Sequence, residues 1–120
     1  MKGYVDVFLL AVPKKNLAAY RRLAQQFGKL VAEHGALEYR EFVGEDLQQP
    51  NFCEEFSKIY KLKLGEVLIT SLIEYRSKAH RNQVNKKLMM DPRMDKMIKA
   101  KPLFDMKRMV YGGFATFYKM

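Results

Sequence analysis

The sequence contains no tryptophan, a single cysteine (Cys53) and no long hydrophobic run. One cysteine cannot form an intramolecular disulfide, which excludes a small scaffold held by disulfides. The longest apolar stretch, Val7–Val12, is far shorter than the roughly 20 residues that a membrane-spanning helix needs. The N-terminus does not resemble a secretory signal, because Asp6 interrupts its apolar run. We therefore expect a cytoplasmic protein with no membrane partner.

The rest of the composition is that of an ordinary globular domain. The 120 residues are 48% hydrophobic and 29% charged, whereas disordered chains combine low hydrophobicity with high net charge. A chain of this length buries roughly two-thirds of its unfolded surface, which is enough for one core. We expect a single domain over residues 1–120.

Acidic residues are scarce, at 13 against 22 lysines and arginines, and the net charge is +9. Eleven basic and three acidic residues lie between Arg76 and Arg108, so about a quarter of the chain carries +8 of that charge. Such a concentration is typical of surfaces that contact anions, nucleic acid among them. The alternative is a solvated face that keeps a small protein in solution. The candidate anion-contact residues are Arg76, Lys78, Arg81, Lys86 and Lys87.

The first half of the chain predicts two strands around a helix. β-branched and aromatic residues indicate a strand at Tyr4–Val12. Apolar residues at helical spacing then predict a helix from Leu17 to about His34, with Asn16 as N-cap and Gly35 as the closing glycine. Ala36–Val43 alternates between apolar and polar residues, as a half-buried strand does. The stretch Phe56–Leu64 is ambiguous.

The second half of the chain again predicts a strand, a helical region and a strand. Glu66–Tyr75 is a strand, Ser77 caps a helix that runs to about Met90, and Asp91-Pro92 starts a short helix. Met109–Tyr118 is the last strand. The order strand, helix, strand, strand, helix, strand is that of the α+β, ferredoxin-like split βαβ fold. That fold has a four-stranded antiparallel sheet with both helices on one face.

The strands are apolar on both faces, although helices cover only one. The two sets in the first strand are Val5, Val7 and Leu9, and Tyr4, Phe8 and Leu10. If the other face were bare, the exposed apolar patch would be larger than soluble monomers normally tolerate. A twofold partner whose sheet packs on that face removes it from water. We therefore expect a homodimer.

Several stretches of the chain are distinctive: Tyr4–Asp6, Glu33–Tyr39, Tyr75–Arg81, Asn85, Met89, Asp91–Arg93 and Phe104–Phe114. Together they resemble the bacterial YbaA-like family of unknown function, over nearly the whole chain. The resemblance implies a dimeric α+β barrel, in which the sheets of two ferredoxin-like subunits enclose an interior. The implied superfamily includes small monooxygenases. The YbaA-like family has no established reaction, so the resemblance implies no catalytic residues. Val7 and Leu72 depart from the family pattern, where a glycine and a tryptophan are usual.

An enclosed apolar interior is a candidate site for a small apolar or aromatic molecule, with or without its oxidation. Asp6 is expected on a central strand, where a carboxylate must be paired or neutral. His34 either closes its helix favourably at the negative end of the dipole or acts as a base or metal ligand. The candidate ligand-binding residues are Tyr4, Asp6, Phe8, His34, Glu38, Arg40 and Phe114.

Other chemistry finds little support in the sequence. Two histidines 46 positions apart and one cysteine match no metal-site spacing, so we expect neither a metal nor a cofactor. His80 is expected in solvent, and Gly112-Gly113 is expected to mark a bulge or a place where a helix approaches the sheet closely, or to clear room for a ligand. The run Gly112–Phe117 resembles an RNA-recognition motif only faintly, because it lacks the leading basic residue and falls on the fourth strand.

Two functional hypotheses follow, and neither identifies a catalytic residue, so the sequence does not decide whether the protein is an enzyme. In the first, the protein binds a small molecule inside the barrel. In the second, it is a non-catalytic interaction protein whose basic second helix contacts RNA or an acidic partner.

Overall fold

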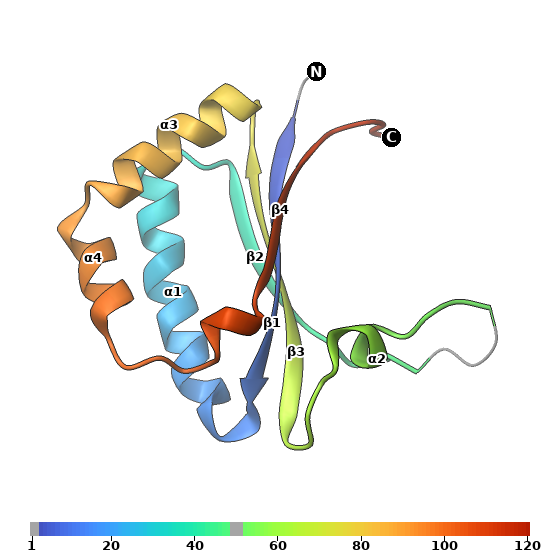
Figure 1. Ribbon diagram of the computed structural model, residues 1–120. Coiled ribbons are helices and arrows are strands. Elements are labelled where there is room, and N and C mark those ends of the chain that lie inside the picture. The colour runs from blue at the N-terminus through green and yellow to red at the C-terminus, as the bar shows by residue number, and fades with distance from the viewer. Residues whose placement is uncertain (1–2, 49–51) are drawn as a thin grey trace.

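In the computed structural model, which describes residues 3–48 and 52–120, four strands form one antiparallel sheet (Figure 1). The strands are β1 (Tyr4–Pro13), β2 (Glu38–Val43), β3 (Glu66–Tyr75) and β4 (Val110–Ala115). Their order across the sheet is β2-β3-β1-β4, which is the ferredoxin-like arrangement. All four predicted strands form, and β4 is shorter than the predicted Met109–Tyr118.

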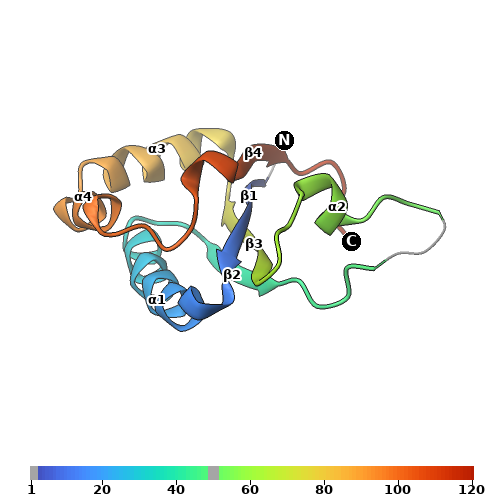
Figure 2. The same ribbon diagram turned by 60° about the horizontal axis from the view of Figure 1, so that its bottom comes forward.

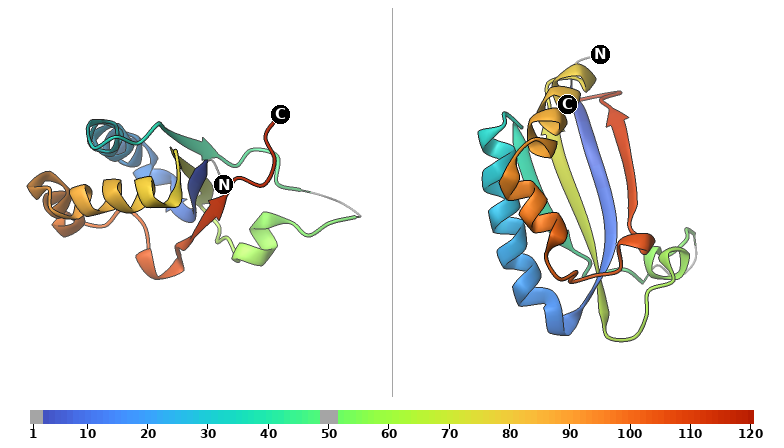
Figure 3. Two further views of the ribbon diagram at one scale, coloured as in Figure 1. Left: turned by 90° about the horizontal axis from the view of Figure 1, so that it is seen from above. Right: turned by 60° about the vertical axis from the view of Figure 1, so that its left-hand side comes forward.

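The main helices lie together on one side of the sheet (Figures 1 and 3). This helix layer consists of α1 (Leu17–Glu33), α3 (Lys78–Met89) and α4 (Pro92–Lys99), with the single turns η1 (Lys14–Asn16) and η2 (Met106–Arg108) at its ends. The five-residue α2 (Phe56–Tyr60) lies on the other side. It belongs to the segment between β2 and β3, residues 44–48 and 52–65, which we call the arm. None of the helices in the described ranges has the length and hydropathy that crossing a bilayer requires.

Local signals in the sequence fix the helix ends. The Ser77 hydroxyl accepts a hydrogen bond from the backbone N–H of His80 at 3.0 Å. Asp91 accepts one from Arg93 at 2.9 Å, so both predicted caps form. Gly35, with φ of +105°, closes α1 in the left-handed conformation that favours glycine. Asn16 begins α1 without a side-chain cap, because its amide instead donates to the Leu103 carbonyl at 2.9 Å.

The core lies between the sheet and the helix layer. Leu30 and Val31 of α1 and Val84 and Leu88 of α3 pack against the end of the sheet where β1 begins and β3 ends. A second cluster, around Tyr20, packs against the opposite end of these two strands. The strand residues in the two clusters are Tyr4, Leu10 and Val12 of β1 and Ile69, Ile73 and Tyr75 of β3. Full burial of one such aliphatic side chain contributes about 1.5–3 kcal/mol to stability. The buried side chains of both clusters therefore hold the helices on this face of the sheet.

The opposite side of the sheet carries no helix of the described ranges apart from α2. The strand register places one set of side chains there, which we call the open face: Val5, Val7, Leu9, Ala11, Glu38, Arg40, Phe42, Leu68, Thr70, Leu72, Glu74, Val110, Gly112 and Phe114. Ala11 and Leu68, at the end from which the arm emerges, are buried, whereas Phe42, Val110 and Phe114 are exposed. The predicted uncovered apolar face is therefore present in the chain.

Candidate functional site

The structure divides the predicted ligand-binding residues among three places. The side of the sheet that faces the helices receives Tyr4, Asp6 and Phe8. The open face receives Glu38, Arg40 and Phe114. His34 lies at the C-terminal end of α1.

The expectation that the strand residues of this set line one interior is therefore wrong. Successive side chains of a strand point to opposite faces, and the core takes Tyr4 and Leu10. Asp6 shares their face, while Val5, Val7 and Leu9 remain on the open one. The sequence did not decide between the two sets because both are apolar enough to be buried.

The helix side of β1 holds a buried carboxylate, that of Asp6, which is 2% exposed. Its Oδ2 accepts a hydrogen bond from the Tyr75 hydroxyl at 3.2 Å, and its Oδ1 accepts one from the Tyr111 hydroxyl at 3.0 Å. Nη1 of Arg81 lies 3.5 Å from Oδ1. The charge is thus paired and hydrogen-bonded, as a buried charge must be. We call Tyr4, Asp6, Tyr75, Arg81 and Tyr111 the Asp6 cluster.

Arg81 reaches from α3 down to the sheet and joins this cluster. Its Nη1 donates to the Tyr111 hydroxyl at 2.6 Å and its Nη2 to the Tyr4 hydroxyl at 3.2 Å. The guanidinium also lies 5.0 Å from the centre of the Tyr4 ring, a cation–π contact. Among the described residues its buried Nε has no hydrogen-bond partner.

The position of Arg81 changes the predicted anion-contact set. Its side chain is only 15% exposed and is paired with Asp6, so it does not share the solvent face of α3. The other members of that set, Arg76, Lys78, Lys86 and Lys87, are exposed.

Gly113 makes room for the Asp6 cluster. A Cβ at this position would lie 2.3 Å from the Tyr4 hydroxyl oxygen and 2.8 Å from the ring. The register between β1 and β4 runs without interruption from Tyr4–Ala115 to Leu9–Val110. The expected bulge is therefore absent from this pairing, and the glycine serves the approach of a tyrosine ring.

The phenols of Tyr75 and Tyr111 hold their protons. Burial raises the pKa of Tyr75, and the neighbouring Asp6 charge raises it further. Burial and the hydrogen bond to Asp6 likewise raise the pKa of Tyr111. Hydroxyls with raised pKa values are hydrogen-bond donors at neutral pH and not phenolate bases or nucleophiles. The cluster is thus suited to fixing the sheet and α3 together.

A second cluster joins the end of α1 to the turn between α3 and α4. Nε2 of His34 lies 2.8 Å from Oδ2 of Asp91. Arg93 donates to the same oxygen at 2.9 Å and to Glu33 at 2.6 Å. The hydrogen bonds from Arg93 and His34 hold the pKa of Asp91 well below its ordinary value. We call these four residues the His34 cluster.

The arrangement of the His34 cluster is that of a helix-end ion pair. The described residues contain no group of three or more His, Cys, Asp and Glu side chains that could hold a metal ion. A metal-ligand role for His34 therefore gains no geometric support among the described residues.

His80 is buried, contrary to the expectation of a solvated side chain. Its Nδ1 accepts a hydrogen bond from the backbone N–H of Arg76 at 3.0 Å, and its ring packs edge-on against Tyr75. With Ser77 as N-cap, His80 occupies the third helical position, where a capping-box side chain reaches back to the backbone before the helix. That spacing was the signal in the sequence that could have placed it.

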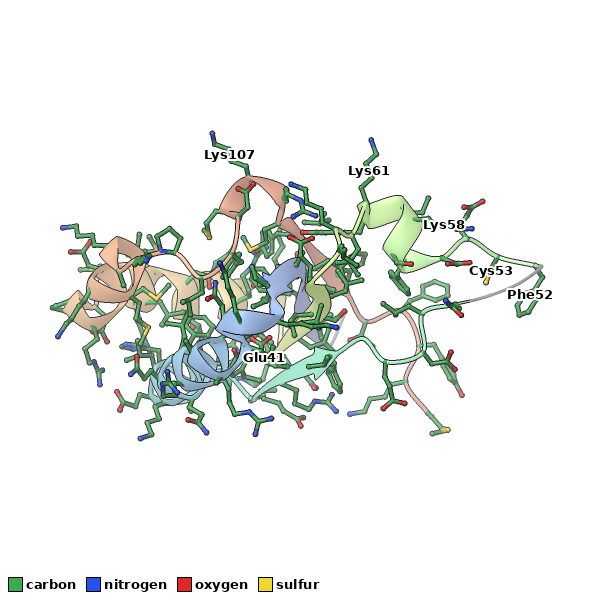
Figure 4. The ribbon with its side chains drawn as sticks, turned by 90° about the horizontal axis from the view of Figure 1, so that it is seen from below. Glu41, Phe52, Cys53, Lys58, Lys61 and Lys107 are labelled. Carbon is green, nitrogen blue, oxygen red and sulfur yellow. The ribbon has the colours of Figure 1, made fainter. Side chains whose placement is uncertain are left out.

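A partly buried carboxylate, that of Glu41 of β2, was not singled out in the sequence (labelled in Figure 4). It accepts hydrogen bonds from the hydroxyls of Tyr20 at 2.9 Å, Ser71 at 2.6 Å and Tyr39. Burial and the nearby carboxylate raise the pKa values of both tyrosines. Like the Asp6 cluster, this group fastens a helix to the sheet.

A hollow of about 250 Å³ lies between α1 and β2. Gly28, Val31 and Tyr39 are part of its lining, and Glu38 is the only member of the predicted ligand-binding set that borders it. None of the three polar clusters has its charged groups there. The hollow therefore brings no reactive groups together.

The family described as "Protein of unknown function (DUF1428)" matches residues 3–106. The chain belongs to this family. It is 40% identical over 113 residues to the uncharacterized protein YbaA of Escherichia coli K12, with 94% of this chain and 95% of that protein covered. YbaA of Shigella flexneri matches with the same identity and coverage. The resemblance to a YbaA-like family of unknown function is confirmed.

The fold of this DUF1428 chain is shared with a solved structure. The crystal structure of a dimeric ferredoxin-like protein from an uncultured marine organism is similar over 100% of both chains, with a TM-score of 0.59 and 8% identity. The stretches that carried the family resemblance supply both clusters at α3. Tyr4–Asp6, Tyr75–Arg81 and Phe104–Phe114 meet in the Asp6 cluster, and Glu33–Tyr39 meets Asp91–Arg93 in the His34 cluster. These stretches thus include the residues that hold the helices against the sheet.

Proposed function

We propose that two copies of the chain pair through their open faces and that the space between the two sheets binds a small apolar or aromatic molecule. The observation that carries this proposal is the open face itself. Phe114, on its edge strand β4, is 58% exposed, and exposed apolar patches of this kind mark interaction sites.

A second copy is the simplest cover for such a face. Two sheets pack face to face about 10 Å apart, and a twofold axis makes one apolar patch complementary to itself. The ferredoxin-like protein of similar fold is described as dimeric, which supports the same assembly for this chain.

The open face also has features of a binding surface. Gly112 leaves a gap in the row of side chains between Val110 and Phe114. At one edge, Glu38 and Arg40 form an ion pair at 3.3 Å. Small-molecule sites typically combine apolar walls with a few polar groups. Of the residues predicted to contact a ligand, Glu38, Arg40 and Phe114 are the three that this site retains.

Light scattering at micromolar concentration tests the pairing. The wild-type protein is expected at twice the chain mass of 14.1 kDa. Leu72→Glu, which places a charge on the open face, is expected at the mass of one chain. Leu37→Glu makes the same change at an exposed leucine outside the open face and should remain a dimer. A wild-type mass of one chain would overturn the proposal.

Nile red, a neutral apolar dye, tests the binding site. Saturable binding to the wild-type dimer is expected, with affinity lowered at least tenfold by Gly112→Leu, which fills the gap. A Cβ at Gly112 meets only the Phe114 ring, at 3.5 Å, so the variant should still fold and dimerise. Absence of saturable binding to a confirmed dimer would remove the ligand and leave the pairing.

A second candidate function rests on the division of charge. The helices α1, α3 and α4 contain ten basic residues and two acidic ones, Glu33 and Asp95, and so carry +8 of the total +9. α3 alone has no acidic residue. This supports contact between the helix layer and the phosphates of RNA, in a mode whose affinity falls steeply with salt.

Fluorescence anisotropy with a labelled single-stranded RNA tests this second function. Lys86→Glu with Lys87→Glu should weaken binding and reduce the salt slope by about 1.4 for two lost contacts. The matched pair Lys14→Glu with Lys15→Glu lies in η1, outside the three helices, and should have a smaller effect. Binding that does not change with salt, or that both pairs weaken equally, would contradict a specific role for α3.

A further inference from the structure

We propose that the arm of each protomer packs against the other protomer and closes one end of the space between the two sheets. This inference rests on the proposed pairing through the open face and adds to it a contribution from the partner chain. Each end of the interior would then be lined by residues of both copies.

The arm has an apolar surface that its own chain leaves uncovered. Phe56 and Ile59 of α2 are 59% and 68% exposed, and Phe52 and Leu64 on either side are still more exposed. Loops that remain in solvent are normally polar, and exposed apolar side chains gathered on one segment mark a contact. The arm therefore has the surface of an interface element.

The base of the arm is held firmly in place. Arg108 forms a bidentate ion pair with the Glu66 carboxylate, at 2.7 and 3.1 Å, and donates a hydrogen bond to the carbonyl of Lys61 at 3.2 Å. Tyr60 donates to the Arg108 carbonyl, and the Arg108 guanidinium lies 5.6 Å from the centre of its ring. A five-residue helix is not stable alone in water. Tyr60 anchors one side of α2, and Phe56 and Ile59 remain for a partner.

The arm stands on the side of the sheet that the second copy would occupy. Figures 1 and 2 show α2 on the side away from the helix layer, and Figure 4 shows Phe52 and Cys53 at the end farthest from the sheet. The C-terminal segment, with exposed Phe117 and Tyr118, extends on the same side. A copy seated on the open face must pass beside the arm, and a twofold axis makes each copy both donor and recipient. Continuity with the proposed interface thus selects a second copy as the occupant.

Cys53, the single cysteine, gives a direct test because it lies on the arm and is exposed. A benzophenone maleimide is attached to it, ¹⁴N- and ¹⁵N-labelled chains are mixed, and the sample is irradiated. Crosslinked peptides of mixed isotope composition are expected, because the arm contacts the partner. In a Cys53→Ser, Lys87→Cys variant the probe sits on the helix layer and should give no crosslink between chains.

The two proposals fail in different ways in this experiment. Crosslinks within one chain only, in a sample that light scattering shows to be dimeric, overturn the arm contact and leave the pairing. A sample that light scattering shows to be monomeric overturns both.

A pair of substitutions tests whether the contact contributes to affinity. Phe56→Ser with Ile59→Ser should raise the dimer dissociation constant at least tenfold, with the far-UV circular dichroism unchanged. Met89→Ser with Met90→Ser removes side chains of similar exposure, 67% and 76%, from the end of α3 and should leave the dissociation constant unchanged. An unchanged constant in the arm variant would contradict the inference.

Discussion

The side chain of Arg81 joins the helix layer to two strands of the sheet. It starts on α3, pairs with Asp6 of β1 and donates to Tyr111 of β4. A buried ion pair of this kind adds little net stability over an apolar substitute, but removal of one partner alone is costly. Arg81 and Asp6 therefore depend on each other.

Replacement of Arg81 by methionine should lower the free energy of unfolding by about 3–5 kcal/mol, because the Asp6 carboxylate is left buried without its counter-ion. Asp6→Asn should cost less, and the double variant should regain part of the loss. Urea denaturation of the four proteins gives the coupling energy. Strictly additive losses would show that the pair does not act as a unit.

The sequence could not place this cluster, for a physical reason. The alternation of β1 identifies two faces, but the choice between them depends on which face the distant helices cover. Asp6 also pairs with a residue 75 positions away. The role of Gly113 could not be predicted for the same reason, since it makes room for the Tyr4 ring in the folded chain. His80, in contrast, could have been placed from its capping spacing to Ser77.

Elements whose ends are set by neighbouring residues were predicted well. The caps Ser77 and Asp91 and the closing Gly35 formed as expected, because their partners lie within three residues along the chain. α2 was ambiguous because Arg108, far away in sequence, holds it. Asn16 lost its capping role to a long-range bond with Leu103.

The His34 cluster makes the stability of the helix layer depend on pH. The folded pKa of Asp91 lies below its ordinary value of 3.8. The stabilisation is therefore fully present above that value and is lost as the pH falls through the folded pKa. In Asp91→Asn the charge is absent, but the side chain can still cap α4.

The unfolding free energies of wild type and Asp91→Asn should thus differ by a constant amount above about pH 5 and should converge as the pH falls below about 4. Urea denaturation at a series of pH values measures this difference. A gap that stays constant down to pH 3 would show that the difference does not come from the charge of Asp91.

At the scale of the whole molecule, the sheet separates two unlike surfaces. One side is the positively charged helix layer, and the other is the apolar open face bordered by the arm. A dimer that buries the open face couples folding to association, so its thermal midpoint depends on protein concentration.

A tenfold increase in wild-type concentration should raise the thermal midpoint by a few degrees. The midpoint of Leu72→Glu, with its charge on the open face, should not change. Differential scanning calorimetry at two concentrations measures both. An equal midpoint at both concentrations for the wild type would mean that the chains unfold independently.

The separation of charge from apolar surface also limits how far assembly can proceed. Once two open faces are packed together, the surfaces that remain outside are the two positively charged helix layers. These repel a third copy, whereas the second copy met an apolar face that matched its own. Growth therefore stops at a closed pair and cannot continue into a filament. Added salt shortens the range of that repulsion to about 10 Å at 0.1 M. Salt should therefore lower the solubility of the dimer without dissociating it into its two chains.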